Sequence, residues 1–200
     1  MGKLIIVMGN SGVGKTTLAH LLCEQGGYLS GLEQIGERPF QGRFATDLTR
    51  YALPNQFDFL LFRAEQEMSI RQAQNSGILD GGLEQDFYIF TRHFLHLGYL
   101  TQEEYDLCKR LVLTLRHLLA PPGLIINLKA PVETISQRYQ RRNRPLEITR
   151  IKDLKELQYL LDDWLAQQTA SPVFTVDASM DDPTYRSVLP DVLAAIARIQ

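Results

Sequence analysis

Apolar and polar residues follow two different periods along this chain. Short apolar runs bounded by turn residues are typical of buried strands, and apolar residues every three to four positions are typical of amphipathic helices. The short runs predict strands at residues 4–8, 77–80, 124–128 and 173–176, with a weaker strand near 33–35. The longer stretches predict helices at residues 15–24, 54–75, 83–97, 102–119, 131–142, 151–167 and 183–199, with Pro131 and Pro183 at first helical positions.

The alternation of strands and helices predicts an α/β fold. We expect a three-layer sandwich, in which helices cover both faces of a mostly parallel sheet of about five strands. The chain has no internal repeat, low-complexity tract or linker, which favours a single domain over residues 1–200. Ligands of such sheets bind beyond the carboxyl ends of the strands. The loops after Met8, Ile35, Asp80 and Leu128 are therefore the places where a site is expected.

Composition and charge narrow the choice of partners. A formal net charge of −2 gives no general attraction to nucleic acid or to an anionic membrane, so neither is expected as a partner. No apolar run approaches the roughly 18 residues that cross a bilayer. The two cysteines, Cys23 and Cys108, are too few to staple a secreted scaffold and favour reduced thiols in the cytoplasm. Any phosphate must be bound by local charge.

A glycine-rich segment directly follows the first predicted strand. Residues 9–16 read GNSGVGKT, which fits the pattern G-x-x-x-x-G-K-[ST], and a predicted helix follows. Backbone N–H groups in such a loop converge on a phosphate, and the helix N-terminus adds a partial positive charge. The expected nucleotide contacts are Gly9, Asn10, Ser11, Gly12, Val13, Gly14, Lys15, Thr16 and Thr17.

Two side chains of this loop have specific expected roles. Lys15 would reach the β- and γ-phosphates of ATP or another nucleoside triphosphate, and the Thr16 hydroxyl would ligate Mg²⁺. Asp80, at the end of a short buried strand, is the second expected Mg²⁺ residue. A chance glycine turn is the alternative, but strand and helix both lie where the motif requires them. The motif alone does not separate kinases from motors and switches.

Further residues indicate a possible acceptor for the phosphoryl group. Glu37 follows the weak strand and could take a proton from an acceptor hydroxyl, with an ordinary surface glutamate as the alternative. Gln56 and Arg63 lie seven residues apart on one face of a largely apolar helix, where a planar nucleobase would offer matching donors and acceptors. Asp86 could pair with Arg63, either to hold it for the base or as a structural ion pair in the core.

A cluster of arginines near residue 140 suggests a lid. Arg138 and Arg142 lie four residues apart and share a helical face, and guanidinium groups match phosphate oxygens. We expect an arginine-rich lid over residues 138–150. A solvated charged face is the alternative reading of the same residues.

Taken in order, these features resemble the deoxynucleoside kinase family of the bacterial type, which has a P-loop NTPase fold. The resemblance runs from Lys3 to about Trp164. It implies that Glu37 is the general base of catalysis. It also implies that Gln56 reads the nucleobase and that Asp86 pairs with Arg63, seven residues after Gln56. The lid pattern Arg-x-Arg-x-x-Glu matches residues 142–147 and implies that Glu147 contacts the sugar 3′-hydroxyl. Relatives commonly pair through helices, so a homodimer is a further option.

Three positions depart from the family pattern. Gly81 stands where the family has an arginine near the transferring phosphate, Ala45 stands where a tyrosine contacts the sugar, and Arg38 intrudes after the catalytic glutamate. An arginine aimed at the transferring group contributes a factor of roughly 10³–10⁵ in rate. We therefore expect Arg38, with Arg43 as a second option, to supply this charge. Ala45 predicts a roomier sugar pocket.

The resemblance implies an ATP-dependent kinase of nucleoside salvage, which phosphorylates the 5′-hydroxyl of a nucleoside or deoxynucleoside to the monophosphate. Catalysis would use Lys15, Glu37 and Arg142, with Mg²⁺ as cofactor. A nucleoside monophosphate kinase or another small-metabolite kinase is one alternative, and the spacing of the glutamine, arginine and aspartate speaks against it. A nucleotide-binding protein with lost or weak kinase activity is the other, and Gly81 and Ala45 favour it.

Overall fold

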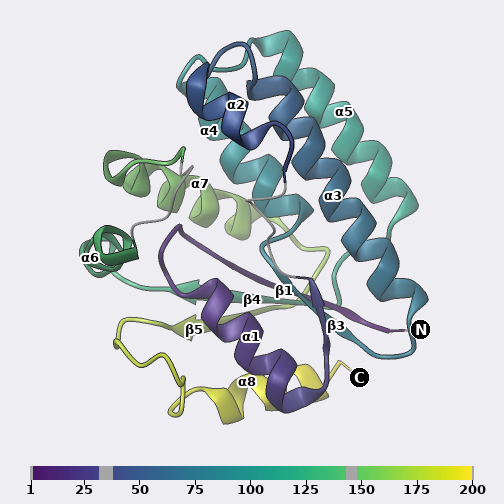
Figure 1. Cartoon of the computed structure of the whole chain (residues 1–200). Helices are drawn as coiled ribbons and strands as arrows, with labels where there is room; N and C mark the ends of the chain where they lie inside the picture. Colours follow the sequence, from purple (N-terminus) through teal and green to yellow (C-terminus); the bar gives the residue numbers. More distant parts are fainter. Residues whose placement is uncertain (1, 32–37, 143–147, 200) are drawn as a thin grey trace.

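The computed structural model of the protein describes residues 2–31, 38–142 and 148–199. In this part of the chain, five parallel strands form one sheet in the order β2-β3-β1-β4-β5 (Figure 1). The predicted α/β fold with a parallel sheet of about five strands is therefore confirmed. The strands are β1 (Leu4–Gly9), β2 (Leu29–Gly31), β3 (Gly77–Asp80), β4 (Leu124–Lys129) and β5 (Val173–Asp177).

Helices connect these strands and cover both faces of the sheet, as the alternating pattern predicts. The two longest, α3 and α5, pack against each other (Figure 1). The helices are α1 (Lys15–Gly26), α2 (Gln41–Thr46), α3 (Ala52–Gln72), the π-helix η2 (Gln85–Thr91), α4 (Arg92–His96), α5 (Gln102–Leu118), α6 (Val132–Arg142), the 3₁₀-helix η3 (Ile151–Asp153), α7 (Leu154–Gln167) and α8 (Leu189–Ala197).

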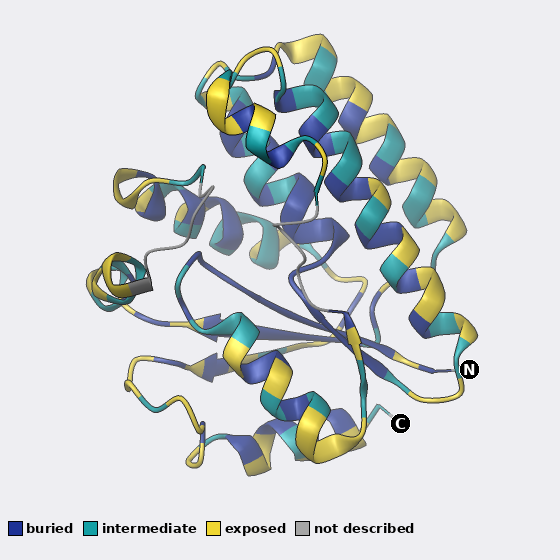
Figure 2. Cartoon of the chain, in the orientation of Figure 1, coloured by how far each residue is buried: buried dark blue, intermediate teal, exposed yellow. Residues whose placement is uncertain are grey.

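The central strand β1 shows how the core is divided. All of its residues are buried, and successive side chains point to opposite faces of the sheet. Ile5 and Val7 pack in the cluster that includes α1 and α8, whereas Leu4, Ile6 and Met8 pack in the cluster that includes α3, η2 and α7. Figure 2 shows the central strands β1, β3 and β4 buried between these two layers of helices, whose outer sides are exposed, whereas the edge strands β2 and β5 are partly exposed. Burying each such side chain stabilises the fold by about 1.5–3 kcal/mol.

Most predicted elements are confirmed, with differences at their ends. The four stronger strands agree within one residue at each end. The second strand is Leu29–Gly31, and the predicted segment 33–35 falls outside the described residues. The predicted helix 83–97 is present as the π-helix η2 followed by α4, and the helix predicted from residue 151 begins with η3. The short helix α2 was not predicted, because six residues are too few to show a period.

The predicted start of the last helix at Pro183 is wrong. Helix α8 begins at Leu189, with Pro190 in its first turn. Directly before Pro183, the Asp182 carboxylate accepts hydrogen bonds from the backbone N–H groups of Thr184 and Arg186, which stabilises a turn. Tyr185 has a φ of 49°, in the left-handed region that a right-handed helix excludes. These local contacts delay the helix by six residues.

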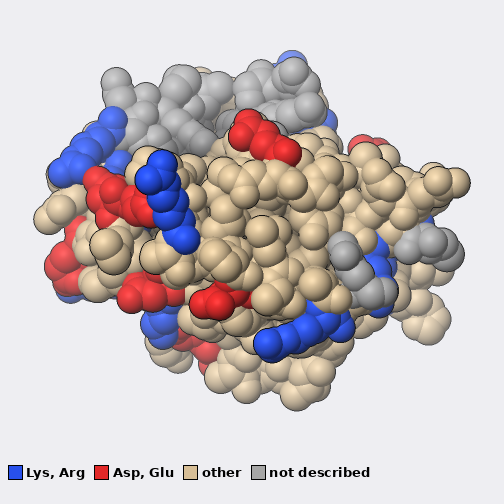
Figure 3. Space-filling model, turned by 90° about the horizontal axis from the view of Figure 1, so that it is seen from below, with Lys and Arg blue, Asp and Glu red and all other residues tan. Residues whose placement is uncertain are grey.

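The surface agrees with the modest net charge. No helix in the described part of the chain is long and apolar enough to span a membrane. On the face seen in Figure 3, basic and acidic side chains are interspersed and uncharged surface separates them. Among the described residues of this face, the basic side chains form no continuous stripe of the kind that binds nucleic-acid phosphates.

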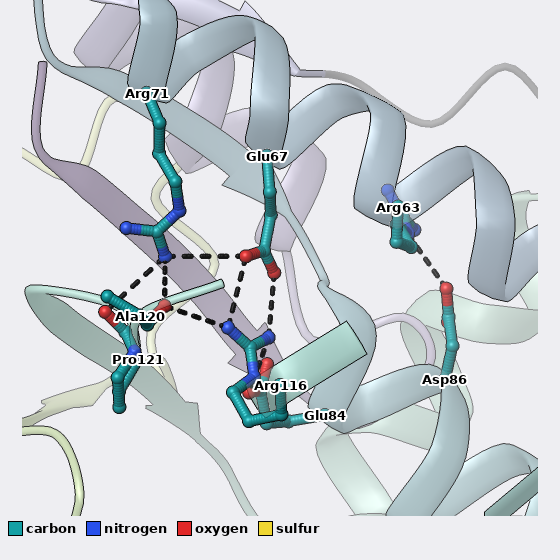
Figure 4. Close-up of polar contacts among 8 residues, drawn as sticks. All are labelled: Arg63, Glu67, Arg71, Glu84, Asp86, Arg116, Ala120 and Pro121. Atoms are coloured by element: carbon teal, nitrogen blue, oxygen red, sulfur yellow. Dashed lines mark hydrogen bonds and ion pairs between the residues drawn. The ribbon is translucent and has the colours of Figure 1, made fainter. Parts of the chain in front are cut away.

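Four charged side chains form a buried cluster that joins α3 to α5 (Figure 4). The fully buried carboxylate of Glu67 lies 2.9 Å from Nη2 of Arg116 and 3.4 Å from Nη2 of Arg71. The same Nη2 of Arg116 lies 2.8 Å from Glu84, just before η2. Both arginines also donate to the carbonyl of Ala120. Buried charges are costly unless they are paired, so this cluster favours one packing of the two helices.

The cluster raises the pKa of Glu84 from 4.5 to about 7, because the carboxyl is buried and Glu67 is near, although Arg116 acts in the opposite direction. The folded state therefore holds this proton more tightly than the unfolded state does. The resulting stabilisation is fully present below about pH 4.5 and is lost as the pH rises through about 7.

We predict that the free energy of unfolding falls by up to about 3 kcal/mol between pH 5 and 8 through this group. Glu84→Gln should flatten that slope, since the amide has no proton to lose. Denaturant titrations at each pH provide the measurement, and Glu24→Gln, at an exposed position on α1, is the matched control. An unchanged slope in Glu84→Gln would show that another group titrates.

Candidate active site

The glycine-rich segment connects β1 to α1 at the carboxyl edge of the sheet. Gly14 precedes the first residue of α1, Lys15, and the first turn of this helix carries no acidic residue. The Lys15 ammonium group lies 3.1 Å from the carbonyl of Gly9 and 3.0 Å from that of Asn10. The strand, loop and helix required by the phosphate-binding motif are therefore all present, with the N-terminus of the helix facing the loop.

Thr16 and Asp80 meet at this edge. The pairing of Val7 with Asp80 places the end of β3 beside the start of the loop. The Thr16 hydroxyl donates to Oδ2 of Asp80 at 2.5 Å, and Asp80 is only 2% exposed. A hydroxyl and a carboxylate are the oxygen ligands that suit Mg²⁺, whose other positions are commonly filled by phosphate oxygens and water. The described residues contain no group of three or more His, Cys, Asp or Glu side chains that could hold a metal without such help.

The predicted pairing of Arg63 with Asp86 is confirmed. Arg63 on α3 is 1% exposed, and its Nε donates to Oδ2 of Asp86 on η2 at 2.7 Å (Figure 4). Its Nη1 donates to Gln66 at 3.1 Å. Burial raises the pKa of Asp86, while the positive charges of Arg63 and Lys15 favour its ionised form. This pair lies near the phosphate loop, because Gln85, the residue before Asp86, accepts a hydrogen bond from the N–H of Gly9 at 3.2 Å.

Gln56 belongs to the same buried face of α3. Its Oε1 lies 2.9 Å from the hydroxyl of Thr91, which also lies 2.8 Å from the carbonyl of Asp86. Thr91 ends the π-helix η2, and such helices occur frequently at functional sites. The structure thus brings Gln56, Arg63 and Asp86 together in one buried polar group between α3 and η2. Their roles in binding a base remain predictions.

Arg138 lines a cavity beside the phosphate loop. The cavity has a volume of about 220 Å³ and lies between residues 12–17 on one side and residues 180–183 and Tyr185 on the other. Arg138 donates to the carbonyls of Ala178 and Met180, each at 2.7 Å. Its guanidinium group therefore holds the loop after β5, and its predicted contact with donor phosphates remains a prediction.

Several predicted residues cannot be placed. Glu37 and Glu147 lie outside the described residues, and the side chain of Arg142, at the end of α6, is also outside them. Their predicted roles as base, sugar contact and lid cation therefore remain predictions.

Comparison with known proteins decides the family. The profile described as deoxynucleoside kinase matches residues 5–198. The chain belongs to the deoxynucleoside kinase family. The deoxyadenosine/deoxycytidine kinase of Bacillus subtilis (strain 168) is 24% identical over 204 residues, which cover 97% of this chain and 93% of that protein. A deoxyguanosine kinase of the same strain is 25% identical over 186 residues, which cover 89% and 87%.

Solved structures of similar proteins have the same fold as this chain. Deoxyadenosine kinase from M. mycoides with bound dCTP superimposes with a TM-score of 0.82 at 22% identity, covering 96% of this chain and 99% of that one. The structure of that enzyme with bound dATP gives a TM-score of 0.82 at 23% identity. The predicted kinase class and the P-loop kinase architecture are thus confirmed.

In this deoxynucleoside kinase-family chain, Gly81 has a backbone conformation and a neighbour that both favour glycine. Its φ is 79°, which side chains with a β-carbon rarely adopt. A β-carbon there would lie 3.1 Å from Nη2 of Arg63, which is closer than an ordinary contact. The Arg63 guanidinium therefore lies next to the position from which the family's arginine would extend.

The other two departures are also placed. Arg38 contacts two residues of α3. Its Nε lies 3.0 Å from Oδ2 of Asp58, and its guanidinium carbon lies 4.4 Å from the centre of the Phe62 ring. The same ring lies 5.9 Å from the guanidinium carbon of Arg63. Ala45 is exposed on α2, whereas its neighbour Phe44 is buried. The role of Arg38 in the reaction and the wider sugar pocket at Ala45 remain predictions.

Sequence reasoning missed three contacts that hold the phosphate loop in place. Gln85 accepts a hydrogen bond from the N–H of Gly9 at 3.2 Å. The Asn10 side chain donates to the carbonyl of Leu154 at 2.8 Å, which ties the loop to the start of α7. Tyr185 donates to the carbonyl of Gly14 at 3.2 Å. These contacts join positions 76 to 171 residues apart, and no local pattern signals them.

We predict that Gly81→Ala lowers the free energy of unfolding by about 1–2 kcal/mol and also weakens nucleoside binding, because the new methyl group displaces Arg63. Gly98→Ala is the matched control, since Gly98 has a φ of 71° and open space around it. Denaturant titration and calorimetric titration with a deoxynucleoside provide the measurements. If both variants bind the nucleoside as the wild type does, Arg63 has no part in recognition.

Proposed function

We propose that this protein transfers the γ-phosphoryl group of ATP to the 5′-hydroxyl of a deoxynucleoside. One observation carries the proposal: the phosphate loop with its Thr16–Asp80 pair lies beside the polar group of Gln56, Arg63 and Asp86. The N–H of Gly9 donates to Gln85, the residue before Asp86, and a β-carbon at Gly81, directly after Asp80, would lie 3.1 Å from Nη2 of Arg63. The phosphate loop could hold a triphosphate, and the polar group could hold a nucleobase. Two relatives in Bacillus subtilis are named as kinases of deoxyadenosine, deoxycytidine and deoxyguanosine. These names support the same substrate class.

The donor would bind at the N-terminus of α1. Backbone N–H groups of the loop would surround its β-phosphate, and Lys15 would leave the carbonyls of Gly9 and Asn10 to neutralise charge on the γ-phosphate. Mg²⁺, when bound by Thr16 and Asp80, would neutralise further phosphate charge. Because phosphoryl transfer needs little covalent help, positioning and charge neutralisation supply most of the catalysis.

The acceptor would bind against α3 and η2. Gln56 offers both a donor and an acceptor, and Arg63 offers donors whose direction Asp86 fixes. In the proposed mechanism Glu37 takes the proton of the 5′-hydroxyl, the oxygen attacks the γ-phosphorus in line, and ADP leaves. Arg142 would stabilise the transferring charge, and Glu147 would bind the sugar 3′-hydroxyl.

A second candidate function rests on Gly81. A nucleotide-binding protein with little transferase activity would retain the phosphate loop and lack the arginine that normally neutralises the transferring group. The intact polar group on α3 and η2 favours the kinase, since a buried guanidinium and carboxylate are costly to retain without use. The same group also speaks against a nucleoside monophosphate kinase. A homodimer and a cytoplasmic location remain predictions.

We predict that purified protein converts deoxynucleosides to their 5′-monophosphates in the presence of Mg²⁺ and ATP. Separate incubations with each common nucleoside and deoxynucleoside, resolved by chromatography, provide the measurement. Lys15→Ala should lower kcat by roughly 100-fold or more, because the charge on the γ-phosphate is no longer neutralised. Lys129→Ala is the control, since Lys129 is exposed at the end of β4. ATP binding without any monophosphate product would favour the inactive binder.

We predict that Arg38→Ala lowers kcat by roughly 10²-fold or more, because Arg38 supplies the charge that Gly81 lacks. Asp58→Asn, which loosens the partner of Arg38 but keeps its shape, should leave kcat unchanged or raise it. Arg50→Ala is the control, because Arg50 is exposed and its guanidinium stacks on Tyr51. Steady-state kinetics with saturating ATP decide the matter, and an unchanged kcat in Arg38→Ala rejects this role.

A further inference from the structure

Tyr185 is the one non-glycine residue with a left-handed backbone among the residues that the structure describes. Its φ of 49° is unfavourable for a side chain with a β-carbon, and such residues persist only where surrounding contacts fix them. They also cluster at functional sites. The contacts of Tyr185 therefore indicate what its conformation is for.

The side chain of Tyr185 reaches the phosphate loop. It is buried in the core cluster that contains Val13 and Leu18, and its hydroxyl donates to the carbonyl of Gly14 at 3.2 Å. A β-carbon at Gly14 would collide with that hydroxyl, so the two residues fit each other. Burial raises the pKa of Tyr185 to about 12, and the hydroxyl therefore keeps its proton and remains a donor.

The loop that carries Tyr185 is held from two sides. Arg138 on α6 donates to the carbonyls of Ala178 and Met180, and its Nη1 also lies 3.4 Å from the carbonyl of Val13. Asp182 holds the turn before Tyr185 by accepting from the N–H of Thr184 at 2.9 Å. The loop after β5 is thereby fixed against Val13 and forms one wall of the 220 Å³ cavity beside the phosphate loop.

The hydroxyl of Tyr185 binds the carbonyl oxygen of Gly14, in the peptide group that precedes Lys15. The carbonyl of Gly14 and the N–H of Lys15 belong to one planar peptide group and point in opposite directions. That carbonyl already accepts the first hydrogen bond of α1, from Leu18 at 3.1 Å, and the tyrosine adds a second. A carbonyl held from outside the loop keeps the Lys15 N–H turned towards the loop interior, where a phosphate would bind.

We propose that Tyr185 is a positioning residue for the donor triphosphate, which acts by fixing the peptide group between Gly14 and Lys15. The proposal rests on the proposed function only in requiring that a nucleoside triphosphate binds this loop. It assigns to the segment after β5 a direct part in shaping the phosphate site, through one hydroxyl group.

The test removes that hydroxyl with Tyr185→Phe, which keeps the ring. The affinity for a non-hydrolysable ATP analogue with Mg²⁺, measured by calorimetry, should fall by about 2–10-fold, the range for one hydrogen bond. The KM for ATP should rise by the same factor, with kcat and the nucleoside KM within about twofold. Tyr28→Phe is the matched control, because Tyr28 packs against the same core cluster at the far end of α1.

The outcomes separate the two claims. If the wild type binds the analogue but phosphorylates no nucleoside, the proposed function fails, and the affinities of the variants still test Tyr185. If Tyr185→Phe melts at a lower temperature than the wild type but binds the analogue equally well, Tyr185 is only structural and the proposal is overturned. A loss of affinity in Tyr28→Phe of the same size would also overturn it.

Discussion

The parallel pairing of β1 with β3 is the constraint on which the rest of the site depends. It aligns Val7 with Asp80, so the loop after β1 and the acid that ends β3 emerge at the same edge of the sheet. The bond of 2.5 Å between Thr16 and Asp80 follows from that alignment. Because both strands are fully buried, a shift of register by one residue would move apolar side chains to the opposite face, where they do not fit, and would separate the two residues.

The phosphate loop is also held by contacts from distant parts of the chain. Gln85 binds its first residue, Asn10 ties its second to α7, and Tyr185 binds the carbonyl before Lys15. A loop fixed at both ends needs little reorganisation when a triphosphate binds, which favours preorganised electrostatic stabilisation. The helix α7 follows the predicted lid, so the contact of Asn10 joins the donor site to the base of that segment.

Two features of the structure favour glycine at position 81, where the sequence is predicted to depart from the family pattern. The backbone at Gly81 is left-handed, and the guanidinium of Arg63 lies next to the place that a β-carbon would take. A second arginine, Arg38, lies near the same Phe62 ring as Arg63 and is paired with Asp58. Two cationic side chains therefore lie close to the proposed acceptor site.

The sequence predicted those parts that local patterns encode. Apolar runs located β1, β3, β4 and β5 within one residue, and the loop motif located Lys15 and Thr16. The pairing of Arg63 with Asp86 was predicted because a buried charge needs a partner. Long-range contacts such as that of Tyr185 with Gly14 were not predictable, since their geometry depends on how α8 packs on the sheet. The same reason explains the wrong start of the last helix at Pro183, where side-chain contacts of Asp182 override a local signal.

The central claim is that one edge of the sheet holds a triphosphate and a nucleoside side by side. The most direct measurement is the affinity of a compound that joins adenosine to a deoxynucleoside through a phosphate chain. The account predicts that this compound binds at least about 100-fold more tightly than ATP or the nucleoside alone, as linked ligands do. It also predicts that Lys15→Ala and Gln56→Ala each weaken that binding. An affinity no higher than that of ATP alone would contradict the account.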